Sequence, residues 1–276
     1  MPVKKSIACL GPAGTHSEAA AKKLFPNNKL SLYPTISTAI SALENKEVSF
    51  CVAPIENSIE GSINITLDNL STNNNFSIVR ELVWPIRNHL LSLDNTTEIK
   101  KIFSHPQALA QCRETLKKLY PNASLQEASS TAEGAALATE NKAFAAIGTL
   151  DAAKINSLLV RNHDIQDSAI NCTRFVVIKA EAFKKAEKDA VKTSLVCELD
   201  GEKPGILYEL LKEFALRKVN LVRIESRPAR TALGRYIFFL DFEKSTDDKD
   251  VRDSLKEVEK HILWMKIIGS YPVLTV

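Results

Sequence analysis

Short apolar runs alternate along the chain with longer segments in which apolar residues recur at a helical spacing. The runs at 6–10, 50–55 and 144–147 fit buried strands, because they are short, β-branched or apolar, and bounded by polar loops. The segments at 36–45 and 105–119 have the composition and spacing of helices. Strands separated by helices of this length favour a mostly parallel sheet, so we predict an α/β fold for this part of the chain.

The predicted helix at 105–119 has a proline in its first turn, as helix starts prefer. Leu109, Cys112, Leu116 and Leu119 form its apolar stripe. Gln111 lies beside this stripe, where it can turn toward a cleft or, as is more common for a helical glutamine, face solvent.

Polar side chains follow the ends of two predicted strands. The first strand leads into a glycine-containing loop with Thr15 and Ser17, and the strand at 50–55 leads into Asn57 and Ser58. Ligands of open α/β sheets bind beyond the carboxyl ends of the strands, so these four side chains are candidate ligand contacts. The loop at 11–17 is equally well explained as a capped helix start. It lacks both the Gly-x-Gly-x-x-Gly pattern and the Lys-Ser/Thr of a phosphate loop, so we predict no nucleotide site.

A third polar strand end lies at Asn171, Thr173 and Arg174, before the apolar run that ends at Ile178. An amide, a hydroxyl and a guanidinium together suit a small anionic ligand. Read alone, the segment is more often a strand start with a surface arginine. In a regular pleat Thr173 and Arg174 would also point to opposite faces of the sheet.

The composition changes after Ile178. Residues 179–192 are rich in Lys, Glu and Ala, which indicates either a charged linker at a domain boundary or a solvated helix. Beyond them we predict, in order, a strand, a helix, two strands, a helix and a strand, at 193–199, 206–216, 219–226, 236–242, 247–261 and 265–268. In the first of these helices Leu207, Leu210, Leu211 and Phe214 make one buried face. The order βαββαβ is that of a ferredoxin-like domain.

The composition narrows the classes of function. The 276 residues have a net charge of +3, spread without a basic stripe, so nucleic acid is not an expected partner. No apolar run approaches the roughly 18 residues that span a membrane, and we see neither a signal peptide nor a cluster of residues with metal-ligand spacing. Five scattered cysteines without a Cys-x-x-Cys pair indicate a reduced, cytoplasmic protein.

Several motifs occur together in the order found in prephenate dehydratases. They are Gly-Pro-Ala-Gly-Thr-His-Ser at 11–17, Pro-Ile-Glu-Asn-Ser-Ile-Glu-Gly at 54–61, Ser-His-Pro-Gln at 104–107 and Asn-Cys-Thr-Arg-Phe at 171–175. The tail, with Pro-Gly-Ile-Leu at 204–207 and Glu-Ser-Arg-Pro at 225–228, resembles the regulatory ACT domain of that family. Each motif alone is weak or moderate evidence, whereas their shared order over nearly the whole chain is highly specific.

The resemblance implies a catalytic domain of two α/β lobes, like the type 2 periplasmic-binding fold, with the active site between the lobes. It places that domain at 1–180, a charged linker at 181–192 and the ACT domain at 193–276. The implied reaction converts prephenate to phenylpyruvate, water and carbon dioxide on the route to L-phenylalanine, without a cofactor.

The resemblance also implies roles for individual residues. Thr173 matches the threonine that acts on the leaving hydroxyl, and Arg174 is the expected carboxylate clamp. The other expected substrate contacts are polar residues at the strand ends and on the helix after His105: Thr15, Ser17, Asn57, Ser58, Ser104 and Gln111. His16 replaces the usual phenylalanine or tyrosine, and would either add a pH-dependent charge or, as we prefer, stack like the ring it replaces.

In the tail, the resemblance implies that L-phenylalanine binds between paired ACT domains, so we expect a homodimer or homotetramer. The positions implied in binding the effector or in the response to it are Gly205, Ile206, Leu207, Asn220, Glu225, Ser226 and Arg227. Ile206 replaces the usual alanine and would crowd the effector pocket.

Two alternatives to a prephenate dehydratase stay open. Arogenate dehydratase performs the same chemistry on an analogue with an ammonium in place of the keto group, and no single residue decides between the two substrates. A non-catalytic sensor is the other alternative, because both component folds also bind ligands. The presence of Thr173 with Asn57, Ser58 and Gln111 argues against a sensor, since a sensor has no need of a leaving-group hydroxyl.

Overall fold

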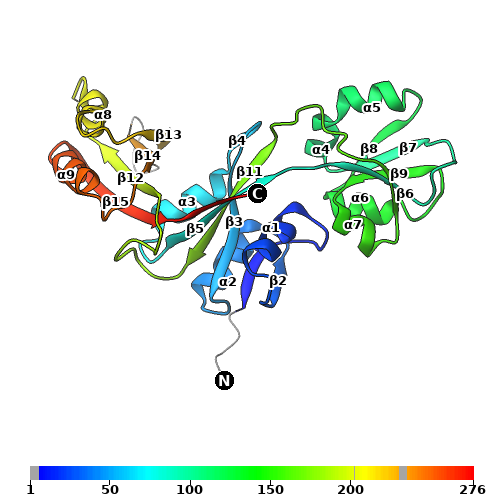
Figure 1. Ribbon diagram of the computed structural model, residues 1–276, viewed down its shortest axis with the longest axis horizontal. Coiled ribbons are helices and arrows are strands. Elements are labelled where there is room, and N and C mark those ends of the chain that lie inside the picture. The colour runs from blue at the N-terminus through cyan, green and yellow to red at the C-terminus, as the bar shows by residue number, and fades with distance from the viewer. Residues whose placement is uncertain (1–5, 202, 230–234) are drawn as a thin grey trace. The chain divides into compact units, whose positions relative to one another are not determined.

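The computed structural model describes residues 6–201, 203–229 and 235–276. Residues 1–5, which contribute to the expectation of no signal peptide, lie outside this part. The chain forms two compact units (Figure 1). The first unit contains Met1–Ile63, Val83–Phe175 and Val276, and the second contains Asn64–Leu82 and Val176–Thr275.

One lobe of the first unit is built on a parallel sheet. Strand β1 (Ile7–Leu10) pairs in parallel with both β2 (Leu30–Tyr33) and β3 (Phe50–Asn57). The short β4 (Gly61–Ser62) pairs antiparallel with the end of β3. Helices α1 (His16–Leu24) and α2 (Ile36–Glu44) connect the strands, and each begins at a threonine whose hydroxyl accepts a hydrogen bond from the first turn. The predicted strand-helix alternation is therefore confirmed for this lobe.

The other lobe of the first unit has a five-stranded sheet in the order β10-β6-β9-β7-β8. Its strands are β6 (His89–Ser92), β7 (Lys101–Ser104), β8 (Ser124–Glu127), β9 (Phe144–Gly148) and β10 (Leu159–Asn162). Its helices are α4 (Pro106–Gln111), α5 (Arg113–Leu119), α6 (Thr131–Leu137) and α7 (Leu150–Ile155). Strand β7 pairs in parallel with β8 and β9, whereas β6 is antiparallel to its two neighbours.

The prediction of a single helix at 105–119 is wrong, because the segment forms two short helices, α4 and α5. The chain leaves the helical conformation at Cys112 (φ −116°, ψ 9°), and α5 begins at the next residue. The carboxylate of Asp167 accepts hydrogen bonds from the backbone N–H groups of Glu114 and Thr115, and so stabilises this second start. The apolar stripe also ends early, because Leu119 is 45% exposed.

Two strands continue from one unit into the other. β5 (Ser77–Pro85) and β11 (Cys172–Lys179) each have residues in both units. Within the first unit, the segments that adjoin these strands cross between the two lobes. They are tied together by a hydrogen bond of 2.8 Å from the Ile86 N–H to the Asn171 carbonyl.

The second unit contains the predicted ferredoxin-like fold. Its elements are β12 (Lys192–Leu199), α8 (Ile206–Leu216), β13 (Leu221–Pro228), β14 (Tyr236–Glu243), α9 (Lys249–Val258) and β15 (Ile262–Tyr271). The sheet order is β13-β14-β12-β15, with every pair antiparallel. Leu210 and Phe214 of α8 are fully buried and pack with Leu240, Phe242 and Val251 in the core.

The second unit also holds α3 (Asn64–Thr72), which directly follows β4 in the chain, and β16 (Val273–Thr275). Side chains of the ferredoxin-like sheet form an ion pair and hydrogen bonds with residues at or near both ends of α3. Arg227 of β13 forms an ion pair of 2.9 Å with Asp68, and its guanidinium also donates to the Asn64 side chain. Lys266 of β15 donates to the carbonyls of Leu70, in the last turn of the helix, and Asn73, just after it, at 2.8 and 2.6 Å.

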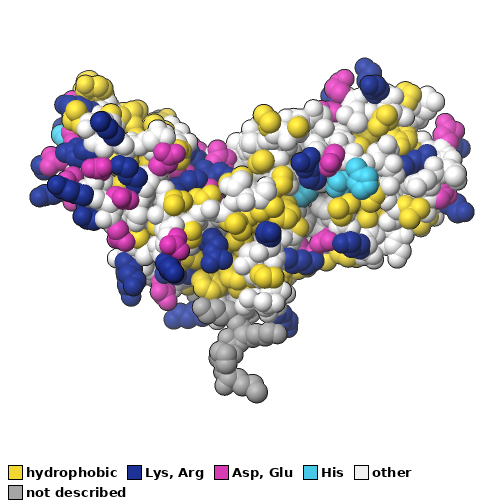
Figure 2. Space-filling model, viewed as in Figure 1, with side chains coloured by type: hydrophobic (Ala, Val, Ile, Leu, Met, Phe, Trp, Pro, Cys, Tyr) yellow, Lys and Arg dark blue, Asp and Glu magenta, His cyan; other side chains and the backbone are white. Residues whose placement is uncertain are grey.

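Residues 180–191 form neither a helix nor a strand, so the solvated-helix interpretation of this charged segment is wrong. Within the described ranges, no helix is both long enough and apolar enough to cross a membrane. Figure 2 shows acidic and basic side chains interspersed over the described residues of the visible face, in agreement with the spread-out charge of the sequence.

Candidate active site

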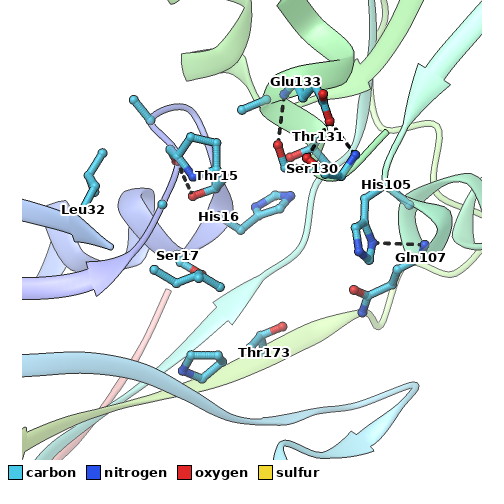
Figure 3. A pocket seen from close by; sticks show the side chains of 18 of the residues that line it. Thr15, His16, Ser17, Leu32, His105, Gln107, Ser130, Thr131, Glu133 and Thr173 are labelled. Carbon is cyan, nitrogen blue, oxygen red and sulfur yellow. Dashed lines mark hydrogen bonds between the residues drawn. The ribbon is translucent and has the colours of Figure 1, made fainter. Parts of the chain in front are cut away.

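A cavity of about 1170 Å³ lies in the first unit and is lined by residues of both its lobes (Figure 3). The first lobe contributes the start of α1, the end of β3 and the start of β11, and the second contributes the starts of α4 and α6. The polar side chains that line it are Thr15, His16, Ser17, Asn57, Asn88, His105, Gln107, Gln111, Ser129, Ser130, Thr131, Glu133, Asn156 and Thr173.

Asn57 sets the hydrogen bonding of Thr173. The Asn57 Oδ1 accepts from the backbone N–H groups of Ile59 and Glu60 at 3.0 and 3.1 Å, which fixes the orientation of the amide. Its Nδ2 therefore donates to Thr173 Oγ1 at 3.0 Å. Because that oxygen already accepts, and no described group accepts from the Thr173 hydroxyl, its proton is available to a molecule in the cavity.

A row of side-chain amides continues from Asn57 across the unit. Asn57 Nδ2 also donates to Asn171 Oδ1 at 3.0 Å, and Asn171 Nδ2 donates to Gln111 Oε1 at 2.8 Å. Asn88 Nδ2 approaches the same Gln111 oxygen at 3.5 Å. The Gln111 oxygen is thus occupied, whereas its Nε2 has no hydrogen-bond partner in the described part of the chain and lines the cavity as a donor.

The row ends at His16, whose Nε2 lies 3.4 Å from Asn88 Oδ1. Because Asn88 donates through its nitrogen to Gln111, its oxygen must accept, and the His16 proton is therefore on Nε2. Burial lowers the pKa of His16 to about 4. The ring is uncharged at neutral pH, which argues against the pH-dependent charge. That His16 stacks like the ring it replaces stays a prediction.

Thr15 and Ser17 lie where α1 meets the cavity (Figure 3). The Thr15 hydroxyl donates to the Pro12 carbonyl at 3.0 Å and accepts from the Glu18 N–H at 3.4 Å, as the cap of α1. The Thr15 hydroxyl proton therefore already has an acceptor, and one of its oxygen lone pairs already accepts a hydrogen bond. The first backbone N–H groups of such a nine-residue helix have no intrahelical acceptor and suit an anion.

Three other predicted substrate contacts do not line the cavity. Ser58 links the β3–β4 turn to the start of β11 by donating to the Ile170 carbonyl and accepting from the Cys172 N–H, at 3.0 and 2.9 Å. Ser104 is fully buried and donates to the Ile147 carbonyl at 2.9 Å.

Arg174 is the third. Its guanidinium forms an ion pair of 2.6 Å with Glu56, and it is absent from the cavity wall that Thr173 lines. Neighbouring residues of a strand point to opposite faces, which accounts for the separation of Thr173 and Arg174.

Sequence reasoning missed several cavity residues. Ser130 caps α6 by accepting from the Glu133 N–H at 3.0 Å, and the Glu133 carboxylate accepts from the N–H and hydroxyl of Ser129. These hydrogen bonds lower the pKa of Glu133. The pattern Ser130-x-x-Glu133 is a helix-start signal that would have placed this loop at the end of β8. Asn88 and Asn171, by contrast, carry no local signal.

The cavity lining lacks a permanent positive charge. Among the described residues that line it there is no lysine or arginine, and Glu133 is the one carboxylate. An anion bound here is therefore stabilised by neutral donors: amide and hydroxyl side chains, histidine N–H groups and backbone N–H groups.

The residues expected to bind the effector or transmit its effect lie around α8 and β13 of the second unit. Gly205 precedes α8 in a left-handed conformation (φ 82°), and Ile206 and Leu207 begin the helix. Asn220 precedes β13 and donates to the Glu243 carboxylate at 3.2 Å. Glu225, Ser226 and Arg227 are in β13, where Arg227 contacts α3 as described above.

Comparison with known proteins identifies both parts of the chain. The family model described as "Prephenate dehydratase" matches residues 7–183, and that described as "ACT domain" matches residues 193–260. A prephenate dehydratase of Methanocaldococcus jannaschii is 37% identical over 277 residues, covering 98% of this chain and 99% of that protein.

Two further relatives bear on the substrate and the regulation. "Arogenate dehydratase/prephenate dehydratase 2, chloroplastic" of Arabidopsis thaliana is 38% identical, covering 98% of this chain and 73% of that protein. The crystal structure of prephenate dehydratase from Arthrobacter aurescens in complex with L-Phe superposes with a TM-score of 0.87. It is 34% identical, with 97% of this chain and 89% of that chain covered.

Proposed function

Because the chain belongs to the prephenate dehydratase family, we propose that it converts prephenate to phenylpyruvate, water and carbon dioxide, in the synthesis of L-phenylalanine. The observation that carries this proposal is the hydrogen bond from Asn57 to Thr173, which leaves a hydroxyl proton to the cavity. The two-lobed catalytic domain and the ferredoxin-like ACT domain of the sequence prediction are confirmed.

The reaction requires a hydrogen-bond donor at the oxygen that leaves. The C–O bond to the ring hydroxyl breaks with its electron pair on oxygen, which takes up a proton and leaves as water. The bond from the ring to its carboxylate breaks at the same time, so that carbon dioxide leaves and the electrons complete the aromatic ring. Thr173 donates a hydrogen bond to the leaving oxygen and relays to it a proton taken from water, so that the Thr173 hydroxyl is restored. Positioned catalysis of this kind is typically worth about 10²–10⁴-fold.

The remaining predicted residues divide into two groups in this proposal. Thr15, Ser17 and Gln111 line the cavity and contact the substrate, with the first turn of α1 and the Gln111 amide as donors to its carboxylates. Ser58 and Ser104 hold the β3–β4 turn and the β7–β9 pair in place, while Arg174 keeps its ion pair with Glu56.

Regulation by L-phenylalanine is the role of the ACT domain. We assign the effector contacts to Gly205, Ile206, Leu207 and Asn220, and the response to the segment 225–227. Helix α3 is the element that passes the response on, because Arg227 and Lys266 hold it from the ACT sheet and it begins seven residues after Asn57 in the chain.

The proposal includes a homodimer or homotetramer formed through the ACT domains. In support, the edge strand β13 exposes Val222 and Ile224, and α8 exposes Tyr208 and Leu216. We retain 1–180, 181–192 and 193–276 as the catalytic domain, linker and regulatory domain. The expectation of a cytoplasmic protein rests on its cysteines, all five of which are free.

The test is phenylpyruvate formation from prephenate, with and without L-phenylalanine, and with arogenate as a competing substrate. The proposal expects turnover of prephenate that the effector suppresses. Preference for arogenate would keep the mechanism and change the substrate. Binding of prephenate without turnover would favour the non-catalytic sensor. The variant Thr173→Ala should be inactive, and Thr173→Ser, which keeps a hydroxyl, is its matched control.

A further inference from the structure

His105 is a cavity residue that the proposed function has not used. It precedes α4 and serves as its cap, because its ring Nδ1 accepts a hydrogen bond from the Gln107 N–H at 3.2 Å (Figure 3). A backbone N–H can only donate, so Nδ1 must present a lone pair. The ring proton is therefore on Nε2 whenever the cap is formed.

The Nε2–H group is available to a ligand. The ring is partly exposed and lines the cavity, and no described residue accepts a hydrogen bond from its Nε2. The cap fixes the ring through its other nitrogen, so this donor is oriented before a ligand arrives. Such a preorganised donor costs little reorganisation when negative charge binds beside it.

The chemistry of the cavity indicates what this donor binds. The cavity has no lysine or arginine among its described lining residues, yet the proposed substrate carries two carboxylates. We propose that His105 is a substrate-binding residue whose Nε2–H donates to a carboxylate oxygen of prephenate. The inference rests on the proposed function and adds a contact to the same site.

His105 is not the acid of the reaction. A neutral imidazole N–H is a far weaker acid than an imidazolium, so it stabilises an anion without giving up its proton. Protonation of Nδ1 would place two donors against each other and break the cap to Gln107. The contact therefore acts in the bound substrate as well as in the transition state, and its loss should raise KM more than it lowers kcat.

Two substitutions separate the cap from the donor. Asparagine is among the best helix-capping residues but does not reach the position of Nε2, so His105→Asn keeps the cap and removes the donor. Glutamine has an amide N–H near the position of Nε2, so His105→Gln keeps a donor in reach and changes the cap. Both variants of the full-length protein are assayed with prephenate, and their melting temperatures are measured.

We expect His105→Asn to melt like the parent while its KM for prephenate rises about 10- to 100-fold, the range for a hydrogen bond to a charged group. We expect His105→Gln to recover most of the KM despite a lower melting temperature. An unchanged KM in His105→Asn, a loss confined to kcat, or a His105→Gln variant no better than His105→Asn would each overturn the assignment. A parent that fails to turn over prephenate would refute the proposed function itself, before any variant is compared.

Discussion

The substitution Asn57→Asp tests the geometry on which the proposed mechanism depends. An aspartate at this position keeps an oxygen that accepts from the Ile59 and Glu60 N–H groups, so the β3–β4 turn is retained. It also places a second carboxylate oxygen where the amide nitrogen lies, 3.0 Å from Thr173 Oγ1. A carboxylate only accepts, so the Thr173 hydroxyl turns toward Asp and no longer donates into the cavity.

Two effects determine how much activity the Asn57→Asp variant loses. Removing one preorganised donor from a reacting oxygen costs about 10²–10³-fold in kcat. The new negative charge also repels the substrate dianion, by about 3 kcal/mol for unit charges some 6 Å apart at an effective dielectric constant of about 20. The cavity offers no described lysine or arginine to offset that repulsion. We therefore expect kcat to fall by at least about 100-fold and KM to rise as well.

The assay is phenylpyruvate formation by Asn57→Asp, Thr173→Ala and the double variant, with melting temperatures to verify folding. If Asn57 acts by orienting the Thr173 hydroxyl, the double variant should lose no more kcat than the more damaged single variant, because residues that act as a unit are not additive. Two results would refute the reasoning: a kcat of Asn57→Asp within tenfold of the parent, or fully additive losses in the double variant.

Three further substitutions have defined outcomes. Asp68→Asn, which weakens the ion pair with Arg227, should reduce inhibition by L-phenylalanine and leave turnover without the effector near the parent value, as measured by effector titration. Glu81→Ala leaves Lys192 without its partner 2.6 Å away and should lower the free energy of unfolding in urea by about 3–5 kcal/mol, since Glu81 is fully buried. His16→Phe keeps a ring but loses the donor to Asn88 and should lower kcat/KM by about tenfold, the value of one hydrogen bond of about 1.4 kcal/mol, whereas His16→Gln, with an amide N–H, should keep most of it.

The sequence predicted the features that depend on local pattern. The buried strands ending at Leu10 and near Asn57 are apolar runs followed by polar loops, and the parallel pairing of β1 with β3 follows from the helices between them. Thr173 lies 116 residues from Asn57, and no period or turn signal connects the two. Their juxtaposition came from the resemblance, and their hydrogen-bond directions only from the structure.

The limits of the prediction are clearest at Asn88 and His105. Asn88 is 1% exposed in a crossing segment, and a single asparagine there has no periodicity to reveal that it joins His16 to Gln111. His105 carried a signal, since it precedes a proline at a helix start, but that signal indicates a cap and says nothing of the second ring nitrogen. Function in this cavity depends on which atom of each polar side chain is already bonded, and a sequence does not contain that information.

The absence of lysine and arginine from the described cavity lining is consistent with the chemistry proposed for it. The ring carboxylate must give up its charge as carbon dioxide leaves, so a cation beside it would stabilise the substrate more than the transition state and slow the reaction. Neutral donors such as Gln111 Nε2 and His105 Nε2 can hold the second carboxylate, whose charge does not change, and Thr173 serves the oxygen on which charge develops. The separation of Arg174 from the cavity, with its charge paired to Glu56, fits this division: the protein orients a dianion without fixing the charge that has to leave.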